Sequence, residues 1–327
     1  MHINDGPLSP QVCLVTGALS VAAVGYSLRR LESSVADKTV PLTGMMAALI
    51  FAGQMVNFPL IGTSGHLMGG VLAAAVLGPW AGCLALTLVL IVQCLMFGDG
   101  GILSLGANTL HMGVVGSLGG YAIMACIRRG LGNSPRSILI GSIVAAWISV
   151  MAAACLFCLE FRLSHSAESF EFSRIFAVMV TVHSGIGVVE ALITGLIVNL
   201  LLTHRPDLIY ENPQSSPAQR TARVVVAGAV CALAAAAFLS PFASSLPDGL
   251  EAVAKSFRFD ELEAESTASL FSDYEVASTF WNWKGLSVSL AGILGTTTVL
   301  VIAAVFARVM NIENVGRTLS PSNEETD

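Results

Sequence analysis

The chain has 327 residues, of which 54% are hydrophobic and only 12% charged, and its formal net charge is −6. Soluble domains carry about 25% charged residues, so this chain has too few charged side chains to cover a soluble domain of its size. Its Lys and Arg residues form no dense basic stripe, which excludes the usual electrostatic footprint of a nucleic-acid-binding protein.

Long apolar runs predict the secondary structure. A helix rises about 1.5 Å per residue, so roughly 20 apolar residues cross the hydrocarbon core of a bilayer. A short run at 67–77, before the helix-breaking pair Gly78-Pro79, could be a short span or a re-entrant segment. We therefore predict an all-α integral membrane protein, a helical bundle of about seven spans followed by a two-span C-terminal module. The eight longer runs are 12–28, 40–58, 81–97, 106–127, 138–159, 175–202, 224–242 and 286–309.

Basic residues predict the orientation of these spans, because Lys and Arg concentrate in cytoplasmic loops. The N-terminus lacks the basic region of a signal peptide, and we expect it to be retained on the outer side of the bacterial inner membrane. Counting 67–77 as a crossing then puts every basic cluster and the C-terminus in the cytoplasm. The N-terminal peptide and the loops 62–66 and 98–101 meet on the outer side.

Composition divides the chain into three parts. Residues 1–205 hold the main bundle, 206–223 form a cytoplasmic linker with several Pro and Ser residues, and 224–327 form the two-span module. The outer loop of this module, 247–284, contains eight acidic residues and accounts for much of the net negative charge.

The seven cysteines lie mostly inside apolar runs. Cys155 and Cys158 form a Cys-x-x-Cys motif within a predicted span, with no second pair elsewhere. We interpret them as small buried apolar residues rather than as a zinc or redox site.

The first two residues carry a chemical signal. The bulky His2 should prevent removal of the initiator methionine, so Met1 should keep a free amine. This amine, the backbone nitrogen of His2 and its imidazole can close fused chelate rings in one plane around a metal ion. Planar nitrogen ligation suits Ni(II) or Cu(II). His66, in a glycine-rich loop on the same outer side, is the best candidate for a fourth nitrogen, although a single loop histidine is usually only solvated.

Other polar residues lie within or beside the apolar runs, where they are costly and usually face the bundle interior or a cavity. Such residues could orient the metal ligands or line the ion cavity, or they could only hold helices together by hydrogen bonds. For His183 and Glu190, seven residues apart on one helix face, we favour the second interpretation. The residues that could support the metal site are Asn57, Asp99, Asn108 and His111.

Motifs that would indicate an enzyme or an ATP-driven pump are missing from the sequence. It has no phosphate-binding Gly-x-x-x-x-Gly-Lys-Ser/Thr loop, so the chain does not power transport through a P-loop site of its own. Neither His-Glu-x-x-His nor Gly-x-Ser-x-Gly occurs, which argues against a membrane hydrolase.

Four motifs, in this order, resemble the CbiM/NikM family, the substrate-specific S-component of energy-coupling factor transporters for cobalt and nickel. The resemblance covers about residues 1–205. The motifs are Met1-His2-Ile3-x-Asp5-Gly6, Gln54-Met55-x-Asn57-Phe58-Pro59, Gly62-Thr63-Ser64-Gly65-His66-Leu67 and Gln93-x-x-x-Phe97-x-Asp99-Gly100-Gly101.

The resemblance implies that the metal is held by the Met1 amine, the amide nitrogen and imidazole of His2, and His66. It also implies two partners, a transmembrane T-component and a cytoplasmic ATPase pair, and no cofactor beyond the transported ion. Asn4 and Pro7 depart from the family motif, which bears on metal preference.

The C-terminal module carries a motif of its own. Its residues Pro247-Asp248-Gly249-Leu250-Glu251 resemble the PDGLE module of the small NikN subunit, here fused to the S-component.

The main prediction is therefore a binding and translocation subunit for Ni(II) or Co(II), not an enzyme. Two alternatives stay open, an S-component for an organic vitamin and an ATP-independent divalent metal channel. The sequence does not decide between nickel and cobalt. We also expect metal binding to weaken on acidification through the imidazole range, which lies near pH 6.5 for free histidine.

Overall fold

The computed structural model describes residues 2–32, 39–166, 168–212, 221–264, 269–271, 274 and 284–319. Met1, the predicted amine ligand, lies outside the described residues, as do parts of the predicted linker and of the acidic outer loop.

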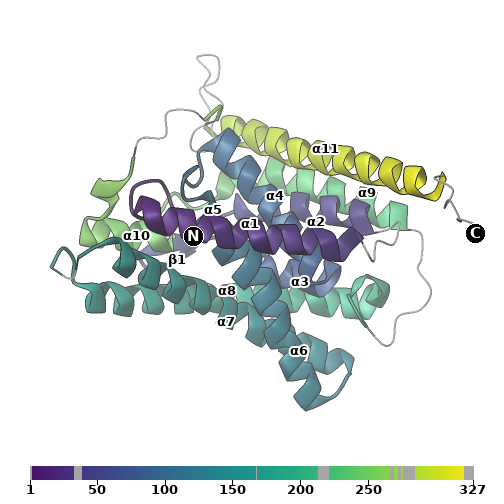
Figure 1. The fold of residues 1–327 in the computed structure, drawn as a ribbon, viewed down its shortest axis with the longest axis horizontal. Helices are drawn as coiled ribbons and strands as arrows, with labels where there is room; N and C mark the ends of the chain where they lie inside the picture. The colour runs from purple at the N-terminus through teal and green to yellow at the C-terminus, as the bar shows by residue number, and fades with distance from the viewer. Residues whose placement is uncertain are drawn as a thin grey trace, which may run out of the picture.

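Helices lying roughly side by side make up most of the fold (Figure 1). Among the described residues, the only sheet is a small antiparallel hairpin in which Phe58 pairs with Gly65 and Leu60 with Thr63. The α-helices are α1 (Pro10–Glu32), α2 (Thr39–Gln54), α3 (Gly70–Leu77), α4 (Pro79–Val92), α5 (Leu105–Asn108), α6 (Gly120–Leu131), α7 (Pro135–Ser164), α8 (Phe172–His204), α9 (Thr221–Ala234), α10 (Gly249–Phe257) and α11 (Lys284–Leu319). The hairpin strands and the shorter or wider helices are β1 (Phe58–Leu60), β2 (Thr63–Gly65), η1 (Gln93–Phe97), η2 (Thr109–Gly119), η3 (Pro206–Leu208), η4 (Ala235–Leu239), η5 (Ser240–Phe242) and η6 (Asp260–Leu262).

The predicted fold class, an all-α membrane bundle, is confirmed. Within the described ranges, seven helices are long and apolar enough to cross a membrane. They are Pro10–Leu31, Pro79–Phe97, Leu105–Leu131, Pro135–Ser164, Phe172–His204, Ala222–Phe242 and Gly285–Phe306.

The remaining two of the nine expected spans form shorter helices. The run at 40–58 yields an apolar helix over Val40–Gln54, because the chain then turns into the hairpin at Phe58. The run at 67–77 yields only α3, whose eight residues rise about 12 Å. Gly69 and Gly78 bound α3 with backbone φ of 76° and 84°, which favour glycine and stop the helix at both ends.

The segment around α3 nevertheless reaches the far end of the bundle. The backbone N–H of Tyr210, beyond the end of α8, donates to the carbonyl of Ala75 at 2.9 Å. Strand β1, which pairs with the preceding strand β2, lies at the opposite end, near α10 (Figure 1). A buried path of extended chain plus a short helix therefore connects the two ends.

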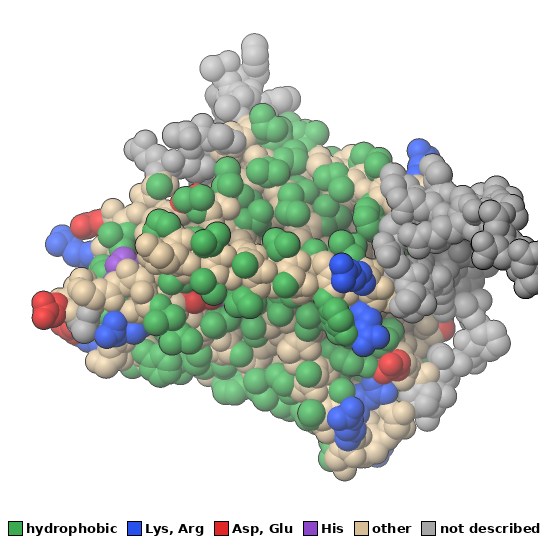
Figure 2. Space-filling view, viewed as in Figure 1, with side chains coloured by type: hydrophobic (Ala, Val, Ile, Leu, Met, Phe, Trp, Pro, Cys, Tyr) green, Lys and Arg blue, Asp and Glu red, His purple; other side chains and the backbone are tan. Residues whose placement is uncertain are grey.

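The two ends of the bundle differ. We call the end that holds the hairpin, α10 and the first described residues the hairpin end. The other is the basic end, because α1 finishes in Arg29 and Arg30 and α6 in Arg128 and Arg129. Between them the surface in Figure 2 is largely hydrophobic, as expected where lipid surrounds the protein.

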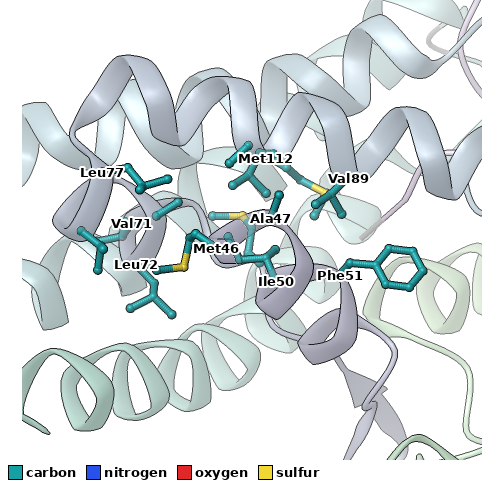
Figure 3. Close-up of a cluster of buried hydrophobic side chains, with 14 of the residues drawn as sticks. Met46, Ala47, Ile50, Phe51, Val71, Leu72, Leu77, Val89 and Met112 are labelled. Atoms are coloured by element: carbon teal, nitrogen blue, oxygen red, sulfur yellow. The ribbon is translucent and has the colours of Figure 1, made fainter. Parts of the chain in front are cut away.

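The core is built mainly from α2, α3 and α4. Met46, Ile50 and Phe51 of α2 pack with Val71 of α3 and Val89 of α4 (Figure 3), and all five are almost completely buried. Small residues let the helices approach closely: a Cβ added to Gly70 would lie 2.6 Å from the backbone of Gly116. This packing holds the loops at the hairpin end in fixed positions.

Candidate metal site

The N-terminal peptide before α1 runs into the hairpin end and is held there by backbone hydrogen bonds. The N–H of Ile3 donates to Oδ1 of Asn108 at 2.8 Å, and Nδ2 of Asn108 donates back to the carbonyl of Ile3 at 3.0 Å. The N–H of Gly101 donates to the same carbonyl at 2.9 Å. Since the Ile3 side chain is also completely buried, the backbone position of the adjacent His2 is well defined.

The loop Asp99-Gly100-Gly101 can fit closely around this peptide because two of its three residues are glycines. Gly100 has a φ of 87°, which side chains disfavour. A Cβ on Gly101 would lie 1.9 Å from Oδ1 of Asp5. That oxygen instead accepts the N–H of Ser104 at 2.9 Å.

His66 follows β2 and is fixed by the turn behind it. Both oxygens of Glu190 on α8 accept backbone N–H groups there, from Met68 at 2.7 Å and from Gly69 at 2.9 Å. Glu190, which the sequence suggested only as a link between helices, thus anchors the loop that carries His66.

The structure brings His2 and His66 together from positions 64 residues apart in the sequence. Their rings stack with centroids 5.0 Å apart and planes inclined by 25°. The two residues are only 9% and 8% exposed. Burial lowers the pKa of both imidazoles to about 3, so both are neutral near pH 7 and can act as nitrogen ligands.

A chain of hydrogen bonds determines which nitrogen of His2 carries the proton. The carbonyl of Met68 can only accept, so Gln54 presents Nε2 to it at 3.1 Å. Oε1 of Gln54 then accepts from Nε2 of Gln93 at 2.8 Å, which leaves Oε1 of Gln93 to accept from Nε2 of His2 at 3.1 Å. In the neutral ring the lone pair is therefore on Nδ1, the nitrogen closest to the backbone and able to chelate with it.

Asp99 lies beside that nitrogen. Its Oδ1 is 3.2 Å from Nδ1 of His2, and its Oδ2 accepts the hydroxyl of Tyr274 at 2.5 Å. Burial raises the pKa of Asp99. Asp99 thus places a carboxyl group directly beside Nδ1 of His2.

Asp248, from the C-terminal part of the chain, is the residue that the sequence did not assign to the site. Its Oδ2 lies 3.8 Å from Nε2 of His66. Burial opposes ionisation of Asp248, but its pKa is nevertheless lowered, in part because the N–H of Glu251 donates to its carboxylate. The PDGLE motif was visible in the sequence, but nothing in it indicated a contact with residue 66.

A cleft of about 670 Å³ opens above these residues, and both halves of the chain line it. His2, His66 and Asp99 contribute from one half, and Asp248 and Glu251 from the other. No Lys or Arg is among the described residues that line the cleft. Its acidic character favours the entry of cations.

Of the other three residues predicted to support the metal site, Asn108 and Asn57 lie at the site or its cleft, and His111 does not. Asn108 holds the N-terminal peptide, and Asn57 lines the cleft while its carbonyl accepts the N–H of Ser244 at 2.8 Å. His111 does not join the site. Its Nε2 lies 2.9 Å from Oε2 of Glu160 without hydrogen-bond geometry, and neither side chain has a hydrogen-bond partner within the described part of the chain.

His183 and the Cys-x-x-Cys pair complete the set of residues considered from the sequence. Nδ1 of His183 lies 3.0 Å from the carbonyl of Met179, and the residue lines a cavity of about 20 Å³ that His66 also lines. Cys155 is partly buried and Cys158 buried, and both are free thiols.

Comparisons with known proteins identify the family of this chain. Residues 2–208 match the family model described as the CbiM cobalt uptake substrate-specific transmembrane region, and residues 222–311 match the PDGLE domain. A protein of Archaeoglobus fulgidus that carries the name of a fused nickel transport protein, NikMN, is 39% identical over 69% of this chain and 73% of its own length.

Two further relatives are similar to this chain. The fused nickel transport protein NikMN of Rhodobacter capsulatus is 36% identical over 67% of this chain and 66% of its own length. A crystal structure of a truncated transition metal transporter shares 37% identity and a TM-score of 0.55, over 62% of this chain and 99% of that one. This chain therefore belongs to the CbiM family of substrate-specific membrane proteins for cobalt uptake, a family of transport proteins rather than enzymes, and it carries a PDGLE domain in the same polypeptide.

Proposed function

We propose that this chain is the substrate-binding subunit of an energy-coupling factor importer for Ni(II) or Co(II). The observation that carries the proposal is the buried stack of His2 and His66, two neutral imidazoles at the floor of an acidic cleft. Such a site attracts a divalent cation and offers it nitrogen ligands.

The proposed ligands are the Met1 amine, the amide nitrogen and Nδ1 of His2, and one ring nitrogen of His66. The hydrogen bond from Nε2 of His2 to Gln93 supports the assignment of Nδ1, because it leaves that nitrogen with its lone pair. Fused chelate rings through Met1 and His2 favour a planar set of four nitrogens, which suits Ni(II) well.

The hairpin end would face the outside of the cell and the basic end the cytoplasm. The arginines at the ends of α1 and α6 support this orientation. Because the sequence has no P-loop, a cytoplasmic ATPase pair and a transmembrane T-component would supply the energy for release of the metal on the inner side. An organic vitamin is disfavoured as substrate, since the family is described for cobalt uptake. A channel that works without ATP is the remaining alternative.

Metal titrations of the purified protein test the ligand set. Ni(II) and Co(II) should bind the wild type with high affinity, and His66→Ala should weaken binding without eliminating it, because three nitrogens remain. Inserting two Gln residues between Met1 and His2 should abolish tight binding, because a bulky second residue keeps Met1 in place while its amine can no longer close the chelate with His2. His204→Ala, an exposed histidine at the basic end, is the matched control and should bind as the wild type does.

Uptake measurements separate the importer from the channel. Cells that express this chain with candidate partners should accumulate labelled metal only when the ATPase is active. Unchanged affinity in both the insertion variant and His66→Ala would refute the proposed ligands, and uptake that persists with an inactive ATPase would refute the importer.

A further inference from the structure

The PDGLE motif at residues 247–251 docks onto the hairpin that carries His66. The carbonyl of Pro247 accepts the N–H of Ser64 at 2.8 Å and the hydroxyl of Thr63 at 2.9 Å. The hydroxyl of Ser64 donates to the carbonyl of Leu246 at 2.8 Å. Ser64 and Asp248 also form a parallel bridge, so the motif lies along the edge of β2 like a short third strand.

Asp248 is the N-cap residue of α10, and the capping hydrogen bonds fix the orientation of its carboxylate. Its Oδ1 accepts the N–H of Glu251 at 2.9 Å, and Oε2 of Glu251 accepts the N–H of Asp248 at 3.3 Å, which together form a capping box. The cap fixes one oxygen, so the other, Oδ2, is directed at Nε2 of His66 across 3.8 Å.

The next two residues seat α10 against the transmembrane bundle. A Cβ on Gly249 would lie 2.5 Å from Cδ1 of Ile186 and 3.1 Å from Cε1 of His183, so the missing side chain lets α10 approach α8 closely. Leu250 is buried in the cluster that also contains Ile3. The carboxylate of Asp248 is thus held on the site by rigid contacts on both sides.

The tautomer of His66 indicates a role for the carboxylate of Asp248. The carbonyl of Leu67 can only accept, so Nδ1 of His66, at 3.0 Å, carries the proton and the lone pair is on Nε2. Nε2 and Oδ2 of Asp248 are therefore two electron-rich atoms directed toward each other. A cation beside them stabilises both.

Charge balance in the proposed metal site leads to the same residue. A divalent ion that displaces the proton of one amide nitrogen and otherwise binds neutral nitrogens keeps a net charge of about +1. A buried charge is costly unless it is paired. The carboxylate of Asp248 is the anionic group placed on the His66 side of the site, whereas Asp99 lies on the His2 side and already accepts the hydroxyl of Tyr274.

We propose that Asp248 is the counter-charge of the bound divalent cation, so that the PDGLE domain completes the metal site rather than acting at a distance from it. This inference rests on the proposed function, because it takes the cation to bind at His2 and His66. Asp248 acts here as a positioning residue that holds the cation on its nitrogen ligands from the cleft side.

Two substitutions remove the charge and keep the cap. Asn and Ser both act as N-cap residues, so Asp248→Asn and Asp248→Ser should retain α10, which thermal unfolding checks. Loss of a partner beside metal ligands typically costs about 10- to 100-fold in affinity, and we expect this increase in the Kd for Ni(II) in both variants, with faster metal dissociation. The matched control is Glu261→Gln, since Glu261 is an exposed carboxylate in the same domain.

The outcomes separate this inference from the proposed function. If either folded Asp248 variant binds Ni(II) within twofold of the wild type while His66→Ala binds weakly, the inference is overturned and the proposed function stands. If the wild type itself does not bind Ni(II) or Co(II), the proposed function falls and the inference with it. An equal loss in Glu261→Gln would also overturn the inference, because the effect would then be one of general charge.

Discussion

Acidification should weaken metal binding in this protein much less steeply than it would weaken binding to a site with exposed histidine ligands. The sequence predicted that binding fails through the imidazole range, near pH 6.5. The structure revises this expectation, because burial lowers the pKa of His2 and His66 to about 3. Both rings are then already deprotonated at pH 5, and metal binding there releases no proton from them.

The difference can be expressed as the number of protons released per metal ion. Between pH 5 and 6 an amine with a pKa near 7.7–8.0 is protonated, and an amide nitrogen is protonated at any ordinary pH, so these two ligands release about two protons. Two imidazoles with a pKa near 6.5 would add nearly two more. The logarithm of the affinity should therefore rise by about two per pH unit, not by about four.

Calorimetric titration in buffers of different ionisation enthalpy measures this number directly. At pH 5.5 we expect about two protons released per Ni(II) in the wild type, and the same number in His66→Ala, since His66 contributes none. Release of about four would show that the imidazoles are protonated in the metal-free protein and would refute the argument from burial. Release close to zero would refute the nitrogen site itself and favour carboxylate ligands.

Two substitutions test the support around the ligands. Gln93→Leu removes the acceptor that fixes the tautomer of His2 and should weaken Ni(II) binding by about 10- to 100-fold, or about 1.4–2.7 kcal/mol; affinity within twofold of the wild type would contradict the tautomer argument. Gly101→Ala would place a Cβ 1.9 Å from Oδ1 of Asp5, so it should loosen the N-terminal peptide, lower the affinity and expose the peptide to proteolysis. Gly130→Ala, which meets nothing within 4 Å, is the control, and a Gly101 variant that matches it would show that the close fit is unimportant.

Topology was predictable from the sequence because it depends on few quantities. Lengths of apolar runs and the placement of arginines were enough to put the N-terminal peptide, the loop before α3 and the loop after η1 on one side. The structure has these three elements together, through the contacts of His2 with His66 and Asp99. Loops at one end of a bundle have only a small area in which to meet.

Side-chain geometry within the bundle was not predictable in the same way. Gln54 and Gln93 each begin one of the motifs found in the sequence, but the hydrogen bond between them depends on helix register. Gln93 begins η1, a wider π-helical turn, which shifts the residues after it away from a 3.6-residue period. A hydrophobic pattern cannot show such a turn. The chain of hydrogen bonds from Met68 through Gln54 and Gln93 to His2 could therefore be found only in the structure.

The contact of Asp248 with His66 was beyond the sequence for a different reason. The two residues lie 182 positions apart, and local signals identify only the cap, through Asp248 and Glu251. Where α10 then docks depends on the shape of α8 and of the hairpin edge. No periodicity in the intervening spans encodes that shape.

The two parts of the proposed site have complementary needs. His2 and His66 are neutral, so without a metal ion they can be buried at modest cost. A cation bound there needs an anion, but an anion buried beside neutral imidazoles without access to water would itself be costly. Placing the carboxylate on α10, whose cap and edge contacts hold it while the cleft keeps it close to water, meets both needs. By this reasoning the PDGLE domain contributes the charge that the nitrogen site lacks, and the metal ion is the group that joins the two parts.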